Sequence, residues 1–269
     1  MDALVSTDWL AARSADEVVV LDASKHLPDA GRDAAAEFVA AHIPGARFLD
    51  LPSLHDASAP VVNTMPTSDQ VSERMGSLGV HADDAIVLYD DSTIRSAARA
   101  WFILREHGFA DVAILDGGVG KWRDEGRALE GGPSADTPAI QVETVEEERV
   151  VTKDALLEVI ASETAQIIDA RDADRFDAGH HPGAANIWFG DLFEADGTYK
   201  SPQALRALFA ERGIDGTKPL ITTCNSGMTA AVLLFAARLA GFENVALYDG
   251  SWQEWGADPA LPVERHGEG

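Results

Sequence analysis

A single cysteine, Cys224, stands in the part of the chain best suited to chemistry. It follows the short, mostly β-branched run Leu220-Ile221-Thr222-Thr223, and a polar turn with Gly227 and then an apolar run come after it. This order predicts a strand, a turn and a helix, which would place the sulfur at the carboxyl end of a strand and near a helix N-terminus. Backbone N–H groups of such a turn, together with the helix dipole, favour a thiolate over a thiol.

The ionisation of Cys224 decides whether it can act as a nucleophile. An ordinary cysteine with a pKa of about 8.5 is only roughly 3% ionised at pH 7. Lowering that pKa by about 2 units requires roughly 2.7 kcal/mol, which a few aligned N–H dipoles and a helix end can supply. We therefore expect a reactive thiolate. The alternative is a small buried apolar residue, as free cysteines commonly are.

The residues around Cys224 alternate between strand and helix patterns. Ser201-Pro202 is typical of a helix start, and Gly213 of the end of the same helix. Such alternation predicts an α/β domain with a mostly parallel sheet covered by helices, in which ligands bind beyond the carboxyl ends of the strands. In the second half we expect strands at 166–169, 220–223 and 245–248, and helices at 152–160, 202–212 and 229–240.

The two halves of the chain resemble each other. At a shift of 133 residues Trp122 falls on Trp255, and Asp116-Gly117-Gly118 falls on Asp249-Gly250-Ser251. Two copies of one domain are the simplest interpretation. At the same shift Asp91 falls on Cys224, so the first copy lacks the nucleophile.

This repeat predicts the domain organisation. We expect a structural N-terminal domain at 1–125, a linker at 126–148 and a catalytic C-terminal domain at 149–269, because a Gly-Gly-Pro-Ser run and an acidic stretch interrupt the pattern between the copies.

The charge of the chain restricts its partners. With 45 acidic and 21 basic residues its formal net charge is −24, which repels phosphate backbones and anionic lipid. We therefore expect no nucleic acid and no membrane partner. The longest apolar run, 230–237, is far shorter than the roughly 20 residues of a membrane span. The first residues lack a signal-peptide pattern, so a cytoplasmic protein is expected.

Three features together resemble the two-domain rhodanese family, which comprises thiosulfate and 3-mercaptopyruvate sulfurtransferases. They are the tandem repeat, the Cys-x-x-Gly-x-Thr loop at Cys224, and the blocks Leu-Asp-Gly-Gly and Tyr-Asp-Gly-Ser-Trp. The resemblance covers roughly residues 3–262. It implies two tandem rhodanese-like domains, each with a mostly parallel five-stranded sheet flanked by helices.

The resemblance also implies a reaction. The Cys224 thiolate would take sulfur from a small-molecule donor, become a persulfide and pass the sulfur to a thiol acceptor, such as thioredoxin or a low-molecular-weight thiol, or to cyanide. Backbone N–H groups of the loop would hold the persulfide, and no metal or organic cofactor is implied. The loop residues are Asn225, Ser226, Gly227, Met228 and Thr229.

The resemblance favours 3-mercaptopyruvate as the donor, with thiosulfate as the alternative. Thiosulfate enzymes carry basic residues after the cysteine, and here Asn225 and Ser226 stand there. In the mercaptopyruvate subfamily the serine assists proton handling, which implies a catalytic role for Ser226. An arginine of that subfamily binds the substrate carboxylate, and Arg175 matches it. The alternative for Arg175 is a surface ion pair with an acidic neighbour, Asp172, Asp174 or Asp177. Arg171 is expected to brace the loop.

The chain also departs from the animal mercaptopyruvate enzymes. Their second arginine has no counterpart, because Asp177-Ala178-Gly179 leaves no room for the longer loop that carries it. An Asp and a His of their N-terminal domain fall approximately on Pro52 and Asn63 here. These departures affect the donor and the proton relay rather than the persulfide chemistry.

Three other functions compete with this interpretation. A cysteine phosphatase needs an arginine six residues after the cysteine, where Ala230 stands. A Cys-His-Asp hydrolase would use His180 or His181, but a similar block recurs at His42 in the copy without cysteine, which favours a structural turn. A sulfur carrier or partner-binding module without turnover stays open.

Overall fold

The protein is described from a computed structural model, which covers all residues except 60, 135–136, 145–148 and 266–269. Contacts between residues divide the chain into two compact units. Unit 1 comprises Met1–Asp56, Met65–Glu147 and Glu194–Tyr199, and unit 2 comprises Ala57–Thr64, Glu148–Phe193 and Lys200–Gly269. The expected linker at 126–148 thus falls largely in unit 1, although its residues 135–136 and 145–148 lie outside the described part.

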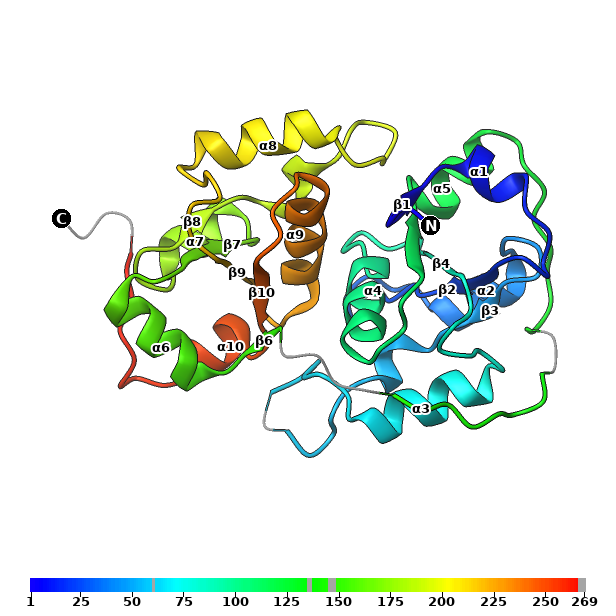
Figure 1. Cartoon of the computed structure of the whole chain (residues 1–269), viewed down its shortest axis with the longest axis horizontal. Coiled ribbons are helices and arrows are strands. Elements are labelled where there is room, and N and C mark those ends of the chain that lie inside the picture. The colour runs from blue at the N-terminus through cyan, green and yellow to red at the C-terminus, as the bar shows by residue number, and fades with distance from the viewer. Residues whose placement is uncertain (60, 135–136, 145–148, 266–269) are drawn as a thin grey trace. The chain divides into compact units, whose positions relative to one another are not determined.

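Each unit contains one five-stranded sheet in which all neighbouring strands are parallel (Figure 1). The strand order is β1-β5-β4-β2-β3 in unit 1 and β6-β10-β9-β7-β8 in unit 2. These are the same order in two copies, because β6 to β10 correspond one for one to β1 to β5. The expected fold class of two parallel five-stranded α/β domains is confirmed.

The elements of both units are short, as the apolar runs predict. Unit 1 contains β1 (Leu4–Val5), α1 (Thr7–Ala11), β2 (Val19–Asp22), α2 (Ala34–Ala40), β3 (Arg47–Phe48), η1 (Leu51–Ser53), α3 (Ser68–Ser77), β4 (Ile86–Tyr89), α4 (Ala97–Glu106), β5 (Val112–Leu115) and α5 (Gly118–Asp124). Unit 2 contains β6 (Val150–Val151), α6 (Lys153–Ser162), β7 (Gln166–Asp169), α7 (Ala173–Ala178), β8 (Ala185–Asn186), η2 (Phe189–Leu192), α8 (Pro202–Glu211), β9 (Leu220–Thr223), α9 (Met228–Leu239), β10 (Val245–Tyr248) and α10 (Ser251–Trp255).

Both faces of the unit 2 sheet are covered. Ile221 of β9 belongs to a buried cluster with Leu156 of α6 and Trp255 of α10. Successive strand residues point to opposite faces, so Thr222 lies on the other face, where α9 packs on β9 and β10. Figure 1 shows α8 and α9 on one side of the sheet, and α6 and α10 on the other. Burial on two faces explains why all four residues of β9 are buried.

Local signals set the ends of the unit 2 helices. The Thr152 side chain accepts a hydrogen bond from the Ala155 N–H and begins α6, and the Ser201 side chain accepts one from the Ala204 N–H and begins α8. Gly213, with φ of 76°, takes the left-handed conformation just after α8. The expected strands at 166–169, 220–223 and 245–248 are confirmed, and the helices agree to within two residues at each end.

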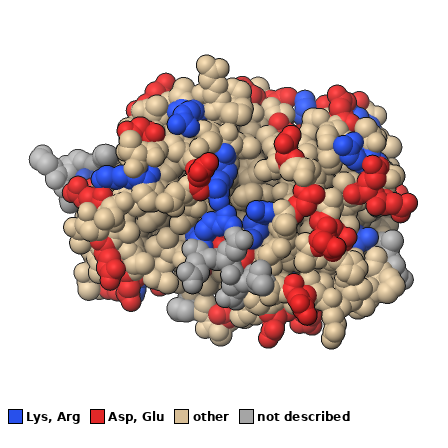
Figure 2. All heavy atoms as spheres, in the orientation of Figure 1, with Lys and Arg blue, Asp and Glu red and all other residues tan. Residues whose placement is uncertain are grey.

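Carboxylate side chains are spread over the face of the molecule drawn in Figure 2, as the net charge of −24 requires. Within the described residues, no helix has the length and apolar character needed to cross a bilayer.

Candidate active site

Cys224 lies where the sequence predicts it, between β9 and α9 in unit 2. Its side chain is fully buried. Gly227 ends the intervening turn with φ of 79°, a left-handed conformation in which glycine has no Cβ penalty. The glycine therefore allows the chain to turn directly from the strand into α9.

One hydroxyl, that of Ser251, organises this turn. Its Oγ accepts hydrogen bonds from the backbone N–H of Cys224 at 3.3 Å and of Gly227 at 3.1 Å. The same hydroxyl donates to the Tyr248 carbonyl at 2.9 Å, and it lies 4.0 Å from the Cys224 sulfur. Ser251 is fully buried and has φ of 51°. Sequence reasoning missed this residue.

The start of α10 also binds the turn. The Trp252 N–H donates to the Cys224 carbonyl and the Gln253 N–H donates to the Asn225 carbonyl, both at 2.9 Å. These are N–H groups of the first helical turn, which have no partner within their own helix. The path of the chain through Cys224 is thus fixed by a segment about 27 residues further on.

The turn expected to hold the persulfide is present, its groups have different settings, and its role as a cradle stays a prediction. The Gly227 N–H donates to Ser251 rather than toward the sulfur. Ser226 is half-buried, and its Oγ accepts a hydrogen bond from the Asn63 amide at 3.2 Å. Asn63 belongs to unit 2 through the segment 57–64, so this contact lies within one unit. In the remainder of the turn Asn225 is exposed, Met228 is buried and Thr229 is half-buried.

Arg171 is fixed by a buried ion pair after β7. Its Nη2 lies 2.7 Å from the Asp169 carboxylate, and both side chains are at most 4% exposed. The guanidinium also donates to the carbonyls of Arg175 and Gly179, and it lies 4.6 Å from the centre of a Trp252 ring. Arg171 therefore braces the loop after β7 against α10, as expected.

Arg175 has a different setting. Its side chain is 70% exposed and forms an ion pair with Asp172 at 3.3 Å. Among the described residues it forms no hydrogen bond or ion pair with the turn at Cys224. Its assignment to the substrate carboxylate stays a prediction, to which the neighbouring Asp172 offers a competing partner.

Both halves of the chain match the model of a known domain family. The model of the rhodanese-like domain matches residues 6–125 and 152–258, once in each half of the chain. The chain belongs to the rhodanese family. The two matches correspond to the two parallel sheets, and the second contains the whole turn from β9 through Cys224 into α9.

Individual rhodanese relatives are similar over nearly the full length. The 3-mercaptopyruvate sulfurtransferase of Escherichia coli (strain K12) is 39% identical over 97% of this chain and 97% of its own, and that of Mus musculus is 38% identical over 94% and 91%. The thiosulfate sulfurtransferase of Bos taurus is 37% identical over 94% and 91%. The crystal structure of SseA from Escherichia coli superposes with a TM-score of 0.87 at 37% identity, covering 94% of this chain and 99% of that one.

The strand register corrects one expectation about the first rhodanese domain. Asp22 pairs with Tyr89 in unit 1, and the equivalent Asp169 pairs with Thr223 in unit 2. The residue after Tyr89 is Asp90, so Asp90 takes the place of Cys224. The expectation that Asp91 does so is wrong by one residue, because an alignment without gaps cannot allow for the extra residue between β4 and α4.

The geometry also weighs against the competing chemistries. Ala230 is buried in α9, so no guanidinium stands where a phosphatase needs one. The His180 ring stacks on Phe176, and its Nδ1 is hydrogen-bonded to the Phe176 carbonyl. His42 makes the same two contacts with Phe38 in the copy without cysteine. Because both copies have this arrangement, we assign a structural role to His180. In the part of the chain that the structure describes, no cluster of three or more His, Cys, Asp or Glu residues could hold a metal.

His181 is no better suited to act as a base. It is fully buried, and neither ring nitrogen has a hydrogen-bond partner among the described residues. Burial is the main cause that lowers its pKa from 6.5 to about 3, and the positive charge of Arg171 lowers it further. A base must be oriented by a neighbour and reach its substrate, and the rings of Tyr248, Trp252 and Trp255 surround this imidazole instead.

Proposed function

We propose that this rhodanese is a 3-mercaptopyruvate sulfurtransferase with Cys224 as its nucleophile. The observation that carries the proposal is the turn Cys224-Asn225-Ser226-Gly227, which joins a buried strand to a helix and has no basic residue after the cysteine. Relatives with the same stated activity are similar over more than nine-tenths of both chains. In this proposal residues 149–269 form the catalytic domain and residues 1–125 a structural one.

The proposed reaction has two half-reactions. The Cys224 thiolate attacks the sulfur of 3-mercaptopyruvate, the carbon–sulfur bond breaks, and the electron pair leaves with carbon as the enolate of pyruvate, which takes up a proton. The enzyme now carries a persulfide. An acceptor thiolate or cyanide then attacks the outer sulfur, and the Cys224 thiolate departs. Ping-pong kinetics follow from this order.

Ser251 gives the thiolate its nearest hydroxyl donor. In the present geometry its proton is used for the Tyr248 carbonyl, and the sulfur lies 4.0 Å away. When Cys224 ionises, the hydroxyl can turn from the carbonyl to the negative sulfur while its oxygen still accepts from the Cys224 and Gly227 N–H groups. A hydrogen bond to the charged form stabilises that form. Ser226 would assist proton transfer, and Arg175 would bind the substrate carboxylate.

A donor can reach the sulfur only when the side chains around it move, because Cys224 has no exposed surface. The Asn63 side chain is the group that we assign to this movement. Its amide donates to the Ser226 hydroxyl at 3.2 Å. A hydrogen bond of this kind contributes roughly 1 kcal/mol, so opening it is compatible with turnover.

The choice of donor is tested by measuring kcat/KM for 3-mercaptopyruvate and thiosulfate on one preparation. We expect a preference for mercaptopyruvate, because thiosulfate is a dianion, the residues after Cys224 are uncharged, and the chain carries a net charge of −24. A strong preference for thiosulfate would overturn the proposal in favour of a thiosulfate sulfurtransferase, an activity that relatives of similar identity also have.

Replacing Arg175 with Ala tests the assignment of the carboxylate. We expect KM for mercaptopyruvate to rise about 10-fold with a small change in kcat, since a lost ion pair of this kind is worth roughly 1–2 kcal/mol. The matched control is Asp172→Asn, which removes the charge that pairs with Arg175 but keeps a side-chain oxygen to accept the Arg175 N–H at the start of α7, and it should leave KM unchanged or lower it. An unchanged KM in the Arg175 variant removes this role.

The persulfide itself is tested by intact-mass measurement after incubation with donor. The wild type should gain the mass of one sulfur atom, and Cys224→Ser should gain none. A mass gain without turnover to any acceptor would favour a sulfur carrier instead. For the acceptor we propose a thiol, with thioredoxin and low-molecular-weight thiols as the first to assay beside cyanide, and we place this chemistry in the cytoplasm.

A further inference from the structure

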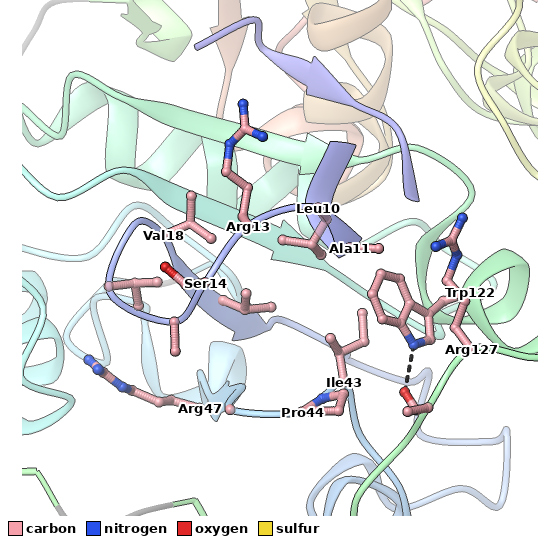
Figure 3. Close-up of a pocket in the computed structure, with 15 residues that line it drawn as sticks. Leu10, Ala11, Arg13, Ser14, Val18, Ile43, Pro44, Arg47, Trp122 and Arg127 are labelled. Atoms are coloured by element: carbon pink, nitrogen blue, oxygen red, sulfur yellow. Dashed lines mark hydrogen bonds between the residues drawn. The ribbon is translucent and has the colours of Figure 1, made fainter. Parts of the chain in front are cut away.

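Unit 1, which lacks the nucleophile, contains a cavity of about 460 Å³ near the start of β2 (Figure 3). Its walls are largely apolar and come from Leu10, Val18, Ile43 and the Trp122 indole. This volume lies within the range of small-molecule sites, roughly 300–1,000 Å³. The Trp122 ring is held in place, because its Nε1 donates to the Ala128 carbonyl at 2.8 Å.

Three arginines, Arg13, Arg47 and Arg127, lie around these apolar side chains (Figure 3). No Asp or Glu is among the described residues that line the cavity. Carboxylates stand just behind this lining, since Glu17 accepts from the Ser14 N–H and hydroxyl and Glu130 accepts from the Gly45 N–H. The cavity therefore combines an apolar interior with arginines at its edge.

The three arginines differ in how far their charge is already neutralised. Arg127 is paired with Asp8 and Glu125. Arg13 lies over the Trp9 ring at 4.0 Å, and Arg47 donates through Nη1 to the carbonyls that follow α3. Among the described residues neither of these two forms an ion pair. Arg13 and Arg47 are thus the cations available to an anionic ligand.

The second copy supplies an internal control for this charge. Unit 2 has a cavity of about 430 Å³ at the equivalent place, lined by Pro182-Gly183 where unit 1 has Pro44-Gly45. Its charged lining is mixed and includes Glu163, Glu264, Arg212 and Lys218. The fold therefore produces the cavity in both copies, whereas the arginine rim belongs to unit 1 alone.

We propose that the unit 1 cavity binds a small aryl or alkyl carboxylate. The apolar body would lie against Trp122, Ile43 and Leu10, and the carboxylate would be held by Arg13 or Arg47. A guanidinium recognises a carboxylate through two parallel hydrogen bonds, and the apolar walls exclude fully hydrated ions. This site is separate from Cys224 and its sulfur chemistry, and it stands whether or not the proposed reaction is correct.

The test uses 4-phenylbutyrate as the probe and its neutral amide, 4-phenylbutyramide, as the control, with binding measured by calorimetry on the full chain. The indole N–H signals in NMR give the location. We expect the Trp122 signal to shift with the carboxylate, while the Trp255 signal, whose Nε1 donates to the Pro262 carbonyl in unit 2, stays in place. The carboxylate should bind about 10-fold more tightly than the amide.

Variants then assign the cations. Arg13→Gln removes an exposed guanidinium that makes no hydrogen bond among the described residues, so it should fold normally, and it should weaken the carboxylate about 5- to 10-fold. Arg47→Lys keeps the charge but loses the two-pronged geometry, and it should weaken binding less. Arg212→Gln in the unit 2 cavity is the matched control and should leave affinity unchanged.

Three results would overturn the proposal. One is equal affinity for the acid and the amide, which would mean an apolar cavity without charge selection. Another is a shift of Trp255 in place of Trp122. The last is unchanged affinity in the double variant of Arg13→Gln and Arg47→Lys.

Discussion

The turns that follow β4 and β9 are the same place in two copies of one domain, and they hold a different group at their centre. Unit 1 has Asp90 there, and unit 2 has Cys224. The Asp90 carboxylate accepts hydrogen bonds from the Ser92 N–H at 3.0 Å and the Ala97 N–H at 2.7 Å. This turn can therefore offer backbone N–H groups to an acceptor at the start of a helix.

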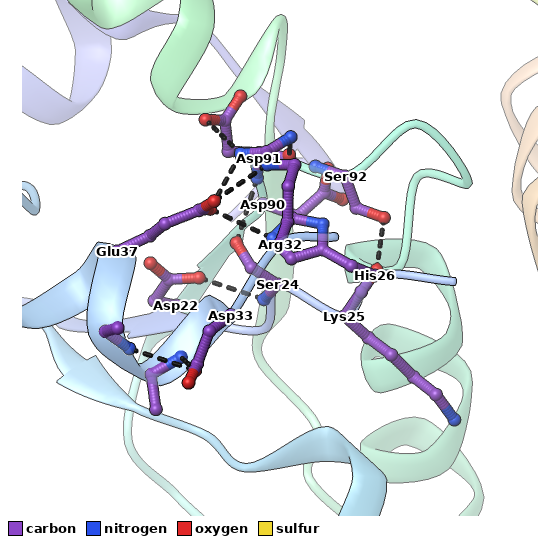
Figure 4. Close-up of polar contacts among 12 residues, drawn as sticks. Asp22, Ser24, Lys25, His26, Arg32, Asp33, Glu37, Asp90, Asp91 and Ser92 are labelled. Carbon is purple, nitrogen blue, oxygen red and sulfur yellow. Dashed lines mark hydrogen bonds and ion pairs between the residues drawn. The ribbon is translucent and has the colours of Figure 1, made fainter. Parts of the chain in front are cut away.

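In unit 1, hydrogen bonds and an ion pair also join the turn to the segment after β2 (Figure 4). The Asp91 N–H donates to Ser24, the Ser96 hydroxyl donates to the Ala23 carbonyl, and Asp91 pairs with Arg32 at 3.0 Å. In unit 2 the Ser251 hydroxyl accepts the N–H groups of Cys224 and Gly227, while Asn225 is exposed and Ser226 half-buried. Unit 1 thus ties its turn to the loop after β2, whereas unit 2 ties its turn to the start of α10.

The first residue of the helix after the last strand, which faces each turn, differs as well. Gly118 in unit 1 lies so close to the chain that a Cβ would come within 2.4 Å of the Asp90 carbonyl oxygen. Ser251 occupies the equivalent place in unit 2 and brings a hydroxyl to the sulfur. The comparison teaches that a fixed carboxylate and a glycine go together in unit 1, whereas a cysteine and a serine go together in unit 2, whose turn we propose to be the reactive one.

The largest predicted effect on this comparison comes from Ser251→Gly, which gives unit 2 the residue of unit 1. We expect kcat for sulfur transfer to fall about 100-fold, because the sulfur loses the hydroxyl that lies 4.0 Å from it. Steady-state kinetics with 3-mercaptopyruvate measure this effect. An unchanged kcat would show that Ser251 only packs.

The elements around both turns were predictable because their signals are local. A β-branched run gives β9, and Ser201 followed by Pro202 gives the start of α8. Cys224 and Ser226 could be singled out from the same stretch of sequence. Ser251 could not, because it acts through contacts across about 27 residues, although a serine standing where the inert copy has Gly118 was an available hint.

Two features needed the three-dimensional structure. The place of Asp90 depends on strand register, which hydrogen bonds between strands define and an ungapped alignment does not. The ion pair of Arg175 with Asp172 depends on the first turn of α7, where both side chains meet. Residue types at suitable spacing suggest a substrate ligand and a surface ion pair equally well.

A second prediction uses His181, which stands where unit 1 has Ile43 in the same loop. Burial lowers the pKa of His181 from 6.5 to about 3, so the unfolded chain binds a proton that the folded unit does not. The contribution of His181 to the free energy of unfolding is therefore fully present above pH 6.5. It is lost as the pH falls from there toward 3, by roughly 1 kcal/mol per pH unit. Arg171 and His180 are the two charged or titratable groups that also lower the pKa of His181.

We therefore expect His181→Ile to resist acid better than the wild type. Denaturant unfolding at pH 7 and pH 5 should show a gap between the two proteins that widens by roughly 2 kcal/mol at the lower pH. The matched change Ile43→His should introduce the same acid sensitivity into unit 1. Parallel pH profiles for wild type and His181→Ile would contradict the buried neutral imidazole.

The smallest predicted effect concerns Asp90, whose contribution to stability changes with pH in the opposite direction to that of His181. Burial raises the pKa of Asp90 from 3.8 to about 6, although the two N–H groups that it accepts lower it. The folded unit thus holds the proton more tightly than the unfolded chain, so this contribution to stability is complete below pH 3.8 and is lost as the pH rises through 6. The raised pKa of Asp90 and the lowered pKa of His181 therefore oppose each other between pH 4 and 6.

Asp90→Asn removes the acid contribution and should make the stability of the protein rise more steeply with pH over this interval, by up to roughly 1 kcal/mol per pH unit. The measurement is denaturant unfolding at pH 4, 5 and 6, beside His181→Ile, which should change the slope in the other direction. Sulfur transfer should be unaffected, because Asp90 lies in the unit without the cysteine. If Asp90→Asn leaves the slope unchanged, the carboxylate is ionised throughout, and its two N–H partners outweigh its burial.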